Sequence, residues 1–180
     1  MARIAALGLS ASVRRTNIGF MGCHAAINAL AVAAAFAASD PNARVLVCCV
    51  ELCTLHLQMS ERVDASVANA LFADGAAAAI VGCTDDPSAP RVSRAASVVV
   101  PDSADQMGWV IGDHGFEMSL GRSVPDTLSR AVGPWVRGVL SEEGLTPSEI
   151  QAWAIHPGGP KVLSAVTDAV EVDPSAADVS

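Results

Sequence analysis

The stretch Met21-Gly22-Cys23-His24 decides the fold, because it opens a long apolar helix. From His24 to Ser39 the sequence has neither glycine nor proline, alanine dominates, and apolar residues occupy every side of the helix. Asp40-Pro41 ends it, since proline has no amide hydrogen to donate. We therefore predict a helix that is buried on all sides, with Cys23 at the turn that leads into it.

The residues that follow alternate between strand and helix patterns. Apolar runs at Arg44 to Val50 and at Ala76 to Val81 predict strands covered on both faces, and Asp64 to Leu71 predicts a helix between them. Arg91 to Val100 alternates as a strand does. Strand, helix and strand in this order predict a layered α/β core.

The second half of the chain has clear start and stop signals for short elements. They predict, in order, a hairpin over Met107 to Leu120 that turns at 112–115, a helix from Val124-Pro125-Asp126 to a glycine cap at Gly144, a short helix opened by the capping box Thr146-Pro147-Ser148-Glu149, a strand over Gln151 to Ile155, and a helix over Lys161 to Val170.

Composition narrows the class of protein. The chain has 180 residues, 51% of them hydrophobic, which predicts one compact unit over 1–180 with no internal domain boundary. A formal charge of −8 without a run of Lys or Arg excludes a nucleic-acid-binding surface. The longest apolar stretch, Ala25 to Ala38, is shorter than the roughly 20 residues that cross a bilayer, so we expect no membrane partner. No signal peptide is visible after Met1, and the cysteines are odd in number without a Cys-x-x-Cys pair, so we expect a cytoplasmic protein with reduced thiols.

Cys23 is the first candidate for catalysis. It lies between Gly22 and the first turn of the helix, where unpaired backbone N–H groups and the helix dipole favour an anion. Such a site lowers the pKa of a thiol and makes it a nucleophile. A glycine before the nucleophile is also typical of the turns that expose nucleophiles in other α/β enzymes. Buried inert thiols are common, so the alternative is a structural cysteine.

His156 is the candidate partner of Cys23. It ends a predicted strand and precedes Pro157-Gly158-Gly159-Pro160, where glycines let a ligand approach the backbone closely. A thiolate beside an imidazolium is held ready for acyl transfer. The alternative is a structural histidine that hydrogen-bonds to a carbonyl.

The remaining histidines and cysteines give weaker signals. Cys53 and His56 have a spacing that could bind zinc, but no second ligand pair is evident, and we predict no metal site. His24 and His114 have no clear partner in the sequence.

Five segments carry one family pattern in the same order. They are Val13 to Leu30 around the Cys23 turn, Asp40-Pro-Asn-Ala-Arg-Val-Leu-Val47, Glu51-Leu-Cys-Thr-Leu-His56, Leu71-Phe-Ala-Asp-Gly-Ala-Ala-Ala-Ala-Ile-Val-Gly82, and Trp153-Ala-Ile-His-Pro-Gly-Gly-Pro-Lys-Val-Leu163. In this combination the sequence resembles bacterial type III polyketide synthases, the chalcone-synthase-like condensing enzymes. The resemblance implies a five-layered αβαβα thiolase fold, incomplete in this chain, with the nucleophile helix around 22–38 and the histidine motif at 153–163.

The resemblance also implies an activity. Members of the family are usually homodimers that load an acyl group from coenzyme A onto the cysteine, here Cys23, and extend it with malonyl-CoA by decarboxylative condensation. His156 would keep the sulfur as a thiolate and donate a hydrogen bond to the thioester oxygen. Coenzyme A thioesters would be substrates rather than bound cofactors, and the residues that hold coenzyme A stay open.

The family pattern places five residues at the substrate pocket. Phe72 falls on an aromatic gatekeeper, and Met118 falls where many members have a second aromatic residue. Cys53, His56 and Trp109 fall on positions that line the cavity. Because Met118 replaces an aromatic ring, the pocket shape and the product length stay open.

The chain also departs from the family. The third catalytic residue, an Asn, lies a few dozen residues after the histidine and so beyond Ser180, and the N-terminal half of the fold, with its basic residues for coenzyme A, would precede Met1. We therefore expect a central-to-C-terminal fragment of roughly half an enzyme. Half of such a fold leaves apolar surface exposed unless another chain covers it.

Three other interpretations stay open. A ketoacyl synthase III-like enzyme of fatty-acid synthesis has the same fold, but its histidine is typically followed by Gln-Ala-Asn rather than by Pro157-Gly158-Gly159. An inactive truncated subunit or dimerisation fragment is favoured by the missing Asn. A thiol hydrolase is disfavoured because no water-activating carboxylate lies near Cys23 or His156 in the sequence. We expect an acyltransferase parent and a poorly active isolated chain.

Overall fold

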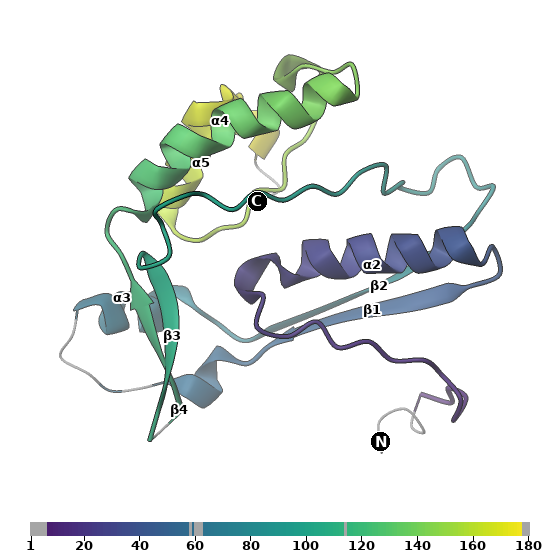
Figure 1. Cartoon of the computed structure of the whole chain (residues 1–180), viewed down its shortest axis with the longest axis horizontal. Coiled ribbons are helices and arrows are strands. Elements are labelled where there is room, and N and C mark those ends of the chain that lie inside the picture. The colour runs from purple at the N-terminus through teal and green to yellow at the C-terminus, as the bar shows by residue number, and fades with distance from the viewer. Residues whose placement is uncertain (1–6, 58, 60–62, 114, 178–180) are drawn as a thin grey trace. The chain divides into compact units, whose positions relative to one another are not determined.

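The chain forms two compact units in the computed structural model, which describes residues 7–57, 59, 63–113 and 115–177 (Figure 1). The first unit comprises Met1–Val47 and Ala79–Ala95, and the second comprises Cys48–Ala78 and Ala96–Ser180. Two units of dense contacts need not be separate domains, so the predicted absence of an internal boundary stays a prediction. The start of the chain, where no signal peptide is visible, and His114 in the predicted hairpin turn lie outside the described residues.

Helix α2 (Ala25–Ser39) is the main element of the first unit, and a 3₁₀ turn, η1 (Gly22–His24), precedes it. Strands β1 (Arg44–Glu51) and β2 (Gly75–Gly82) pair as a two-stranded sheet, and each strand contributes residues to both units. The thiol of Cys83 donates to the carbonyl oxygen of Ala37 at 3.5 Å, so the segment after β2 lies against the end of α2. The predicted helix and both predicted strands are confirmed.

The predicted burial of these elements is wrong. Within α2 only Ala33 and Ala37 are buried, and Ile27 is 51% exposed. In β2, Ile80 is 73% exposed. The residues of α2, β1 and β2 are apolar enough to be buried on every face. A two-stranded sheet and one helix have too few neighbouring elements to bury them.

The solvent-accessible surface area of the chain shows how incomplete this burial is. It exposes 13138 Å², whereas a folded monomer of 18.3 kDa exposes about 8,100 Å². An interface between two units of a chain buries only about 600–1,500 Å². Most of the surplus therefore lies on faces that these residues do not cover themselves.

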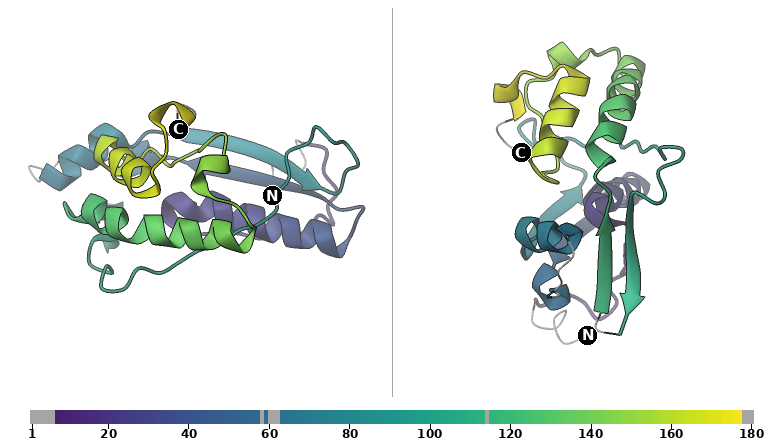
Figure 2. Two further views of the ribbon diagram at one scale, coloured as in Figure 1. Left: turned by 90° about the horizontal axis from the view of Figure 1, so that it is seen from above. Right: turned by 90° about the vertical axis from the view of Figure 1, so that its left-hand side faces the viewer.

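The second unit contains the remaining elements, which are short and mostly helical. They are the 3₁₀ turn η2 (Cys53–His56), helix α3 (Val63–Leu71), strands β3 (Met107–Gly112) and β4 (Gly115–Leu120), helix α4 (Val124–Glu142), the turn η3 (Pro147–Glu149), helix α5 (Pro160–Val170) and the turn η4 (Pro174–Ala177). Strands β3 and β4 form an antiparallel hairpin that η2 and α3 contact. Helices α4 and α5 lie side by side (Figure 2).

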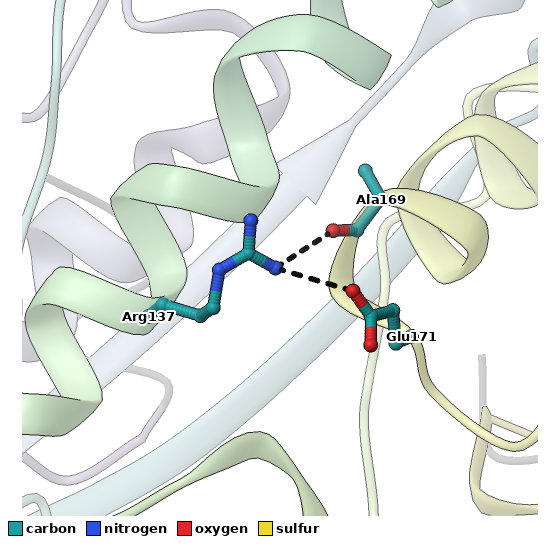
Figure 3. A network of polar contacts seen from close by, with 3 residues as sticks. All are labelled: Arg137, Ala169 and Glu171. Carbon is teal, nitrogen blue, oxygen red and sulfur yellow. Dashed lines mark hydrogen bonds and ion pairs between the residues drawn. The ribbon is translucent and has the colours of Figure 1, made fainter.

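A close approach of backbones joins α4 to α5. Gly133 is buried, and a Cβ atom there would overlap the carbonyl oxygen of Ala169. Arg137 Nη1 donates to that same oxygen at 3.3 Å and lies 3.8 Å from Oε1 of Glu171 (Figure 3). The glycine is therefore required by the short distance between the helices.

Elements predicted from local signals are confirmed in this unit. The hairpin pairs Met107 with Leu120, and α4 is followed by Gly144 at a φ of 71°, a conformation that suits glycine. The capping box is present, because the carboxylate of Glu149 accepts from the amide of Thr146 at 2.8 Å. The predicted helix over Lys161 to Val170 is confirmed and begins one residue earlier.

Two predicted strands, Arg91 to Val100 and Gln151 to Ile155, are wrong, since both segments lack regular structure. Alternation of side chains is not sufficient for a strand, which also needs a hydrogen-bonded neighbour. The amide of Trp153, for example, donates to the carbonyl of Ala176 in η4 at 2.8 Å rather than to another strand.

By length and composition alone, the described segment Gly22–Ser39 is apolar and long enough to cross a membrane, with 11% of it buried. A core helix of a soluble protein passes the same test, so the segment is weak evidence for a membrane span.

Candidate active site

Cys23 lies in the turn that leads into α2. It is exposed in η1, directly before the helix. Phe20 and Gly22 have φ angles of 59° and 56°, a left-handed conformation that is strained for phenylalanine and natural for glycine. This geometry places the thiol at the end of α2 where backbone N–H groups lack helical partners. The predicted glycine turn before the candidate nucleophile is thus present.

His24 has a partner that the sequence did not indicate. Its Nε2 is hydrogen-bonded to Nδ2 of Asn28 at 3.1 Å, one helical turn further along. The bond links the His24 ring to the first turn of α2.

His156 is exposed at the start of a tight loop before α5. The amide of Gly158 donates to the carbonyl oxygen of His156 at 2.8 Å. A Cβ atom on Gly159 would lie 3.4 Å from a methyl group of Leu71, so this loop lies against the last residue of α3. The histidine motif therefore comes close to the segment that carries Phe72.

Three of the predicted pocket residues gather around the hairpin. The rings of His56 and Trp109 both stand edge-to-face to Phe116, with centroid distances of 5.3 and 6.2 Å. Met118 lies opposite Trp109 in the hairpin register and shares a face with Phe116. Phe116, which the sequence indicates only as a core or pocket-wall residue, is the ring that joins this cluster.

His56 contains a buried polar atom. Its Nδ1 has no hydrogen-bond partner among the residues that the structure describes. A buried nitrogen in that state is costly unless a ligand or water satisfies it. Within the same residues, no three His, Cys, Asp or Glu side chains gather as metal ligands do.

Cys53 and Phe72 are half-buried on two neighbouring segments. Cys53 begins η2, and Phe72 follows α3 with its amide bonded to the carbonyl of Ala68 at 2.9 Å. Between these segments, Thr54 donates two hydrogen bonds to the carboxylate of Asp74, and these bonds hold the pKa of Asp74 below its usual value. The sequence analysis missed this pair, because Asp74 fits a simple turn and nothing in the sequence marks residues 20 apart as partners.

All the predicted site residues except Cys23 belong to the second unit. Within that unit, His56, Trp109 and Met118 gather around Phe116, the Thr54–Asp74 hydrogen bonds link the segments that carry Cys53 and Phe72, and the His156 loop lies beside Leu71. Cys23 belongs to the first unit, so its pairing with His156 stays a prediction.

Known proteins resemble this chain over most of its length. The sequence model of the chalcone and stilbene synthase N-terminal domain matches residues 2–87, and that of the C-terminal domain matches residues 91–180. The chain is 34% identical over 162 residues to the alpha-pyrone synthesis polyketide synthase-like protein Pks18 of Mycobacterium tuberculosis, covering 87% of this chain and 41% of that protein. It is 35% identical over 178 residues to 1,3,6,8-tetrahydroxynaphthalene synthase of Streptomyces peucetius subsp. caesius, covering 97% of this chain and 47% of that protein.

A solved polyketide synthase structure is also similar to this chain. PKS-I of the brown alga Ectocarpus siliculosus matches with a TM-score of 0.89 and 27% identity, over 96% of this chain and 47% of that one. The chain thus spans about half the length of the relatives it matches.

Proposed function

Because the chain belongs to the chalcone and stilbene synthase family, we propose that it is part of an acyltransferase of the type III polyketide synthase kind. The family and the thiolase-like α/β fold predicted from the sequence are confirmed, with about half of that fold present. The observation that carries the proposal is the exposed thiol of Cys23, which follows the left-handed residue Gly22 in the 3₁₀ turn before α2. This is the geometry that a nucleophile needs.

In the proposed loading step, the Cys23 thiolate attacks the carbonyl carbon of an acyl-CoA. The new carbon–sulfur bond forms as the bond to the coenzyme A sulfur breaks, and coenzyme A leaves as a thiolate that takes up a proton. Backbone N–H groups at the start of α2 favour the negative sulfur before attack. The product is an acyl thioester on Cys23.

In the proposed extension step, malonyl-CoA loses carbon dioxide and its α-carbon attacks the thioester carbonyl. A carbon–carbon bond forms, the bond to the Cys23 sulfur breaks, and a β-ketoacyl-CoA leaves. His156 donates a hydrogen bond to the thioester oxygen of malonyl-CoA, where negative charge develops as carbon dioxide departs. The aromatic cluster around the β3–β4 hairpin supports the assignment of His56, Trp109 and Met118 to the acyl pocket, and the family pattern adds Cys53 and Phe72.

The proposal extends to substrates, assembly and location. Acyl-CoA and malonyl-CoA enter as substrates, and the reaction needs no bound cofactor or metal, since the cysteine and the histidine supply the nucleophile and the hydrogen bond. We infer a homodimer, as the family resemblance implies. We also infer a cytoplasmic location and no nucleic-acid or membrane partners. The acidic net charge of −8 supports the absence of a nucleic-acid partner.

A second candidate function is that of a non-catalytic subunit, an inactive truncated subunit or dimerisation fragment of such an enzyme. The exposed area of 13138 Å² favours it, because uncovered apolar faces mark surfaces for other chains. Under this alternative the purified chain folds but takes up no acyl group.

One experiment separates the two functions. The purified chain is incubated with acyl-CoA starters and carboxyl-labelled malonyl-CoA, and both the mass of the protein and the release of labelled carbon dioxide are measured. We expect an acyl-sized mass gain that Cys23→Ala abolishes and that Cys48→Ala, a change at another exposed thiol, leaves intact. His156→Ala should slow loading, because the thiolate loses its imidazolium partner, and should abolish carbon dioxide release, because no hydrogen bond reaches the thioester oxygen. A folded chain without any mass gain would favour the non-catalytic subunit.

A further inference from the structure

Thr54 and Asp74 are joined by two short hydrogen bonds within the second unit. The backbone amide of Thr54 donates to Oδ1 of Asp74 at 2.8 Å, and the hydroxyl of Thr54 donates to Oδ2 at 2.6 Å. Both carboxylate oxygens are therefore used by one residue. Hydrogen bonds to an ionised carboxylate are shorter and roughly twice as strong as neutral ones. We refer to this pair as the Thr54–Asp74 clip.

The clip has a longer span than three other hydrogen-bonded carboxylates whose pKa is lowered. Asp86 and Asp173 bond to serines two residues away, and Glu149 bonds to Thr146 three residues away. Those contacts close local turns, whereas the clip spans 20 residues. In all four cases the hydrogen bonds lower the pKa of the carboxyl group, so each is ionised at neutral pH. Only a contact of long span can fix one segment against another.

The two segments that the clip joins carry three predicted pocket residues. Thr54 lies in η2 between Cys53 and His56, and Asp74 lies two residues after Phe72. The amide of Thr54 is in the first turn of η2, where a backbone donor has no acceptor inside the helix, so Asp74 also caps that turn. On its other side, η2 is held by the edge-to-face contact of His56 with Phe116.

We propose that Asp74 is a positioning residue that sets which acyl chains the pocket accepts. By holding η2 against the loop after α3, it keeps Cys53 and His56 at one distance from Phe72 and so fixes the width of the space between them. The role rests on the proposed function, because that function assigns the three residues to the acyl pocket. Both members of the clip are exposed, so its loss affects the placement of these side chains more than the core.

The test compares four variants by two measurements. Asp74→Ala removes both hydrogen bonds, and Thr54→Val removes only the bond from the hydroxyl. Thr54→Ser keeps the hydroxyl. Asp86→Ala, the matched control, removes a local carboxylate contact. Hydrogen exchange of the Thr54 amide reports the clip itself. The rates of acyl loading over a series of straight-chain acyl-CoA thioesters, from acetyl to lauroyl, report selection by chain length.

The expected results separate placement from general loss of structure. Asp74→Ala should speed exchange of the Thr54 amide about tenfold, the change expected for one hydrogen bond to a charged group. It should change the ratio of long-chain to short-chain loading by a similar factor while acetyl loading stays within about twofold. Thr54→Val should fall between this variant and the wild type, and Thr54→Ser and Asp86→Ala should match the wild type.

Three outcomes would overturn the role of Asp74. Unchanged exchange in Asp74→Ala would mean that the clip does not form. Faster exchange with an unchanged chain-length ratio would mean that the clip does not act on selection. If the wild-type chain takes up no acyl group, the proposed function fails and the selection role fails with it, while the exchange rates still decide whether the clip exists.

Discussion

Replacing Gly133 by alanine should destabilise the protein, and the same replacement at Gly138 in the same helix should stabilise it. A Cβ atom at position 133 would overlap the carbonyl oxygen of Ala169 and lie 3.1 Å from its carbonyl carbon. A Cβ atom at position 138 would meet nothing within 4 Å. The two variants make the same chemical change in α4, so any difference in their effects comes from the approach of α5.

The size of each effect follows from opposing contributions. The overlap forces α4 and α5 apart, which costs about 1–3 kcal/mol for an overpacked contact. Separation also weakens the bond from Arg137 to Ala169, now 3.3 Å long, by about 1 kcal/mol. Alanine regains about 1 kcal/mol over glycine in a helix. The net loss for Gly133→Ala is about 1–3 kcal/mol, and the net gain for Gly138→Ala is about 0.5–1 kcal/mol.

Thermal and urea denaturation followed by circular dichroism measure both changes. For a chain of this length, 1 kcal/mol shifts the midpoint temperature by about 2–4 °C, so the two variants should move the midpoint in opposite directions. If both variants stabilise the protein equally, α4 and α5 do not approach so closely that a Cβ atom at position 133 would overlap Ala169, and the reasoning is refuted.

Two further predictions concern the ends of short elements. The hydrogen bonds from Thr54 lower the pKa of Asp74 from its usual value of 3.8. The stability that the clip contributes is therefore present above pH 3.8 and is lost as the pH falls through the lower pKa of the folded state. The amide resonance of Thr54 should shift in that acidic range, and a resonance that does not change with pH would contradict the clip. Glu171→Gly should raise the midpoint temperature, because Glu171 has a φ of 63°, which costs about 1 kcal/mol for a residue with a Cβ, while its exposed ion pair with Arg137 at 3.8 Å contributes little. A lower midpoint for Glu171→Gly would show that the ion pair outweighs the strain.

Local chemistry explains the elements that the sequence predicts correctly. Thr146 and Glu149 satisfy each other's backbone and side-chain groups within four residues, and Gly144 ends α4 because it adopts a positive φ. Neither signal depends on distant parts of the chain. The turn at Gly22 before Cys23 belongs to the same class, since it can be predicted from the glycine and the helix that follows.

Contacts between distant segments explain the failures. The strands predicted at Arg91 to Val100 and Gln151 to Ile155 have suitable side chains but lack the neighbouring strand that would complete them. The apolar residues of α2 predict burial, yet burial depends on the elements available to cover the helix. A local sequence pattern indicates that a segment suits a strand or a buried helix. It does not show whether the chain contains the neighbouring element that completes the sheet or buries the helix.

The residues of the candidate site also divide into those with a local signal and those that depend on distant contacts. Cys23 and His156 stand out from their own flanking residues and from the family pattern. Phe116 and Asp74 do not, because their importance comes from rings and hydroxyl groups that lie far away in the sequence. Asp74 lies two residues after Phe72 within a segment that carries the family pattern, and that proximity is the signal that could have indicated it.

The most direct test of the central claim is the acyl occupancy of each of the five cysteines after brief exposure to one acyl-CoA, measured by peptide mass spectrometry on a single sample. Cys23, Cys48 and Cys83 are all exposed, so simple accessibility predicts comparable acylation of the three. The account predicts acylation concentrated on Cys23, because it is the one cysteine of the five that follows a left-handed glycine at the start of a long helix. Acylation that follows exposure alone, with Cys48 and Cys83 modified as fast as Cys23, would contradict it.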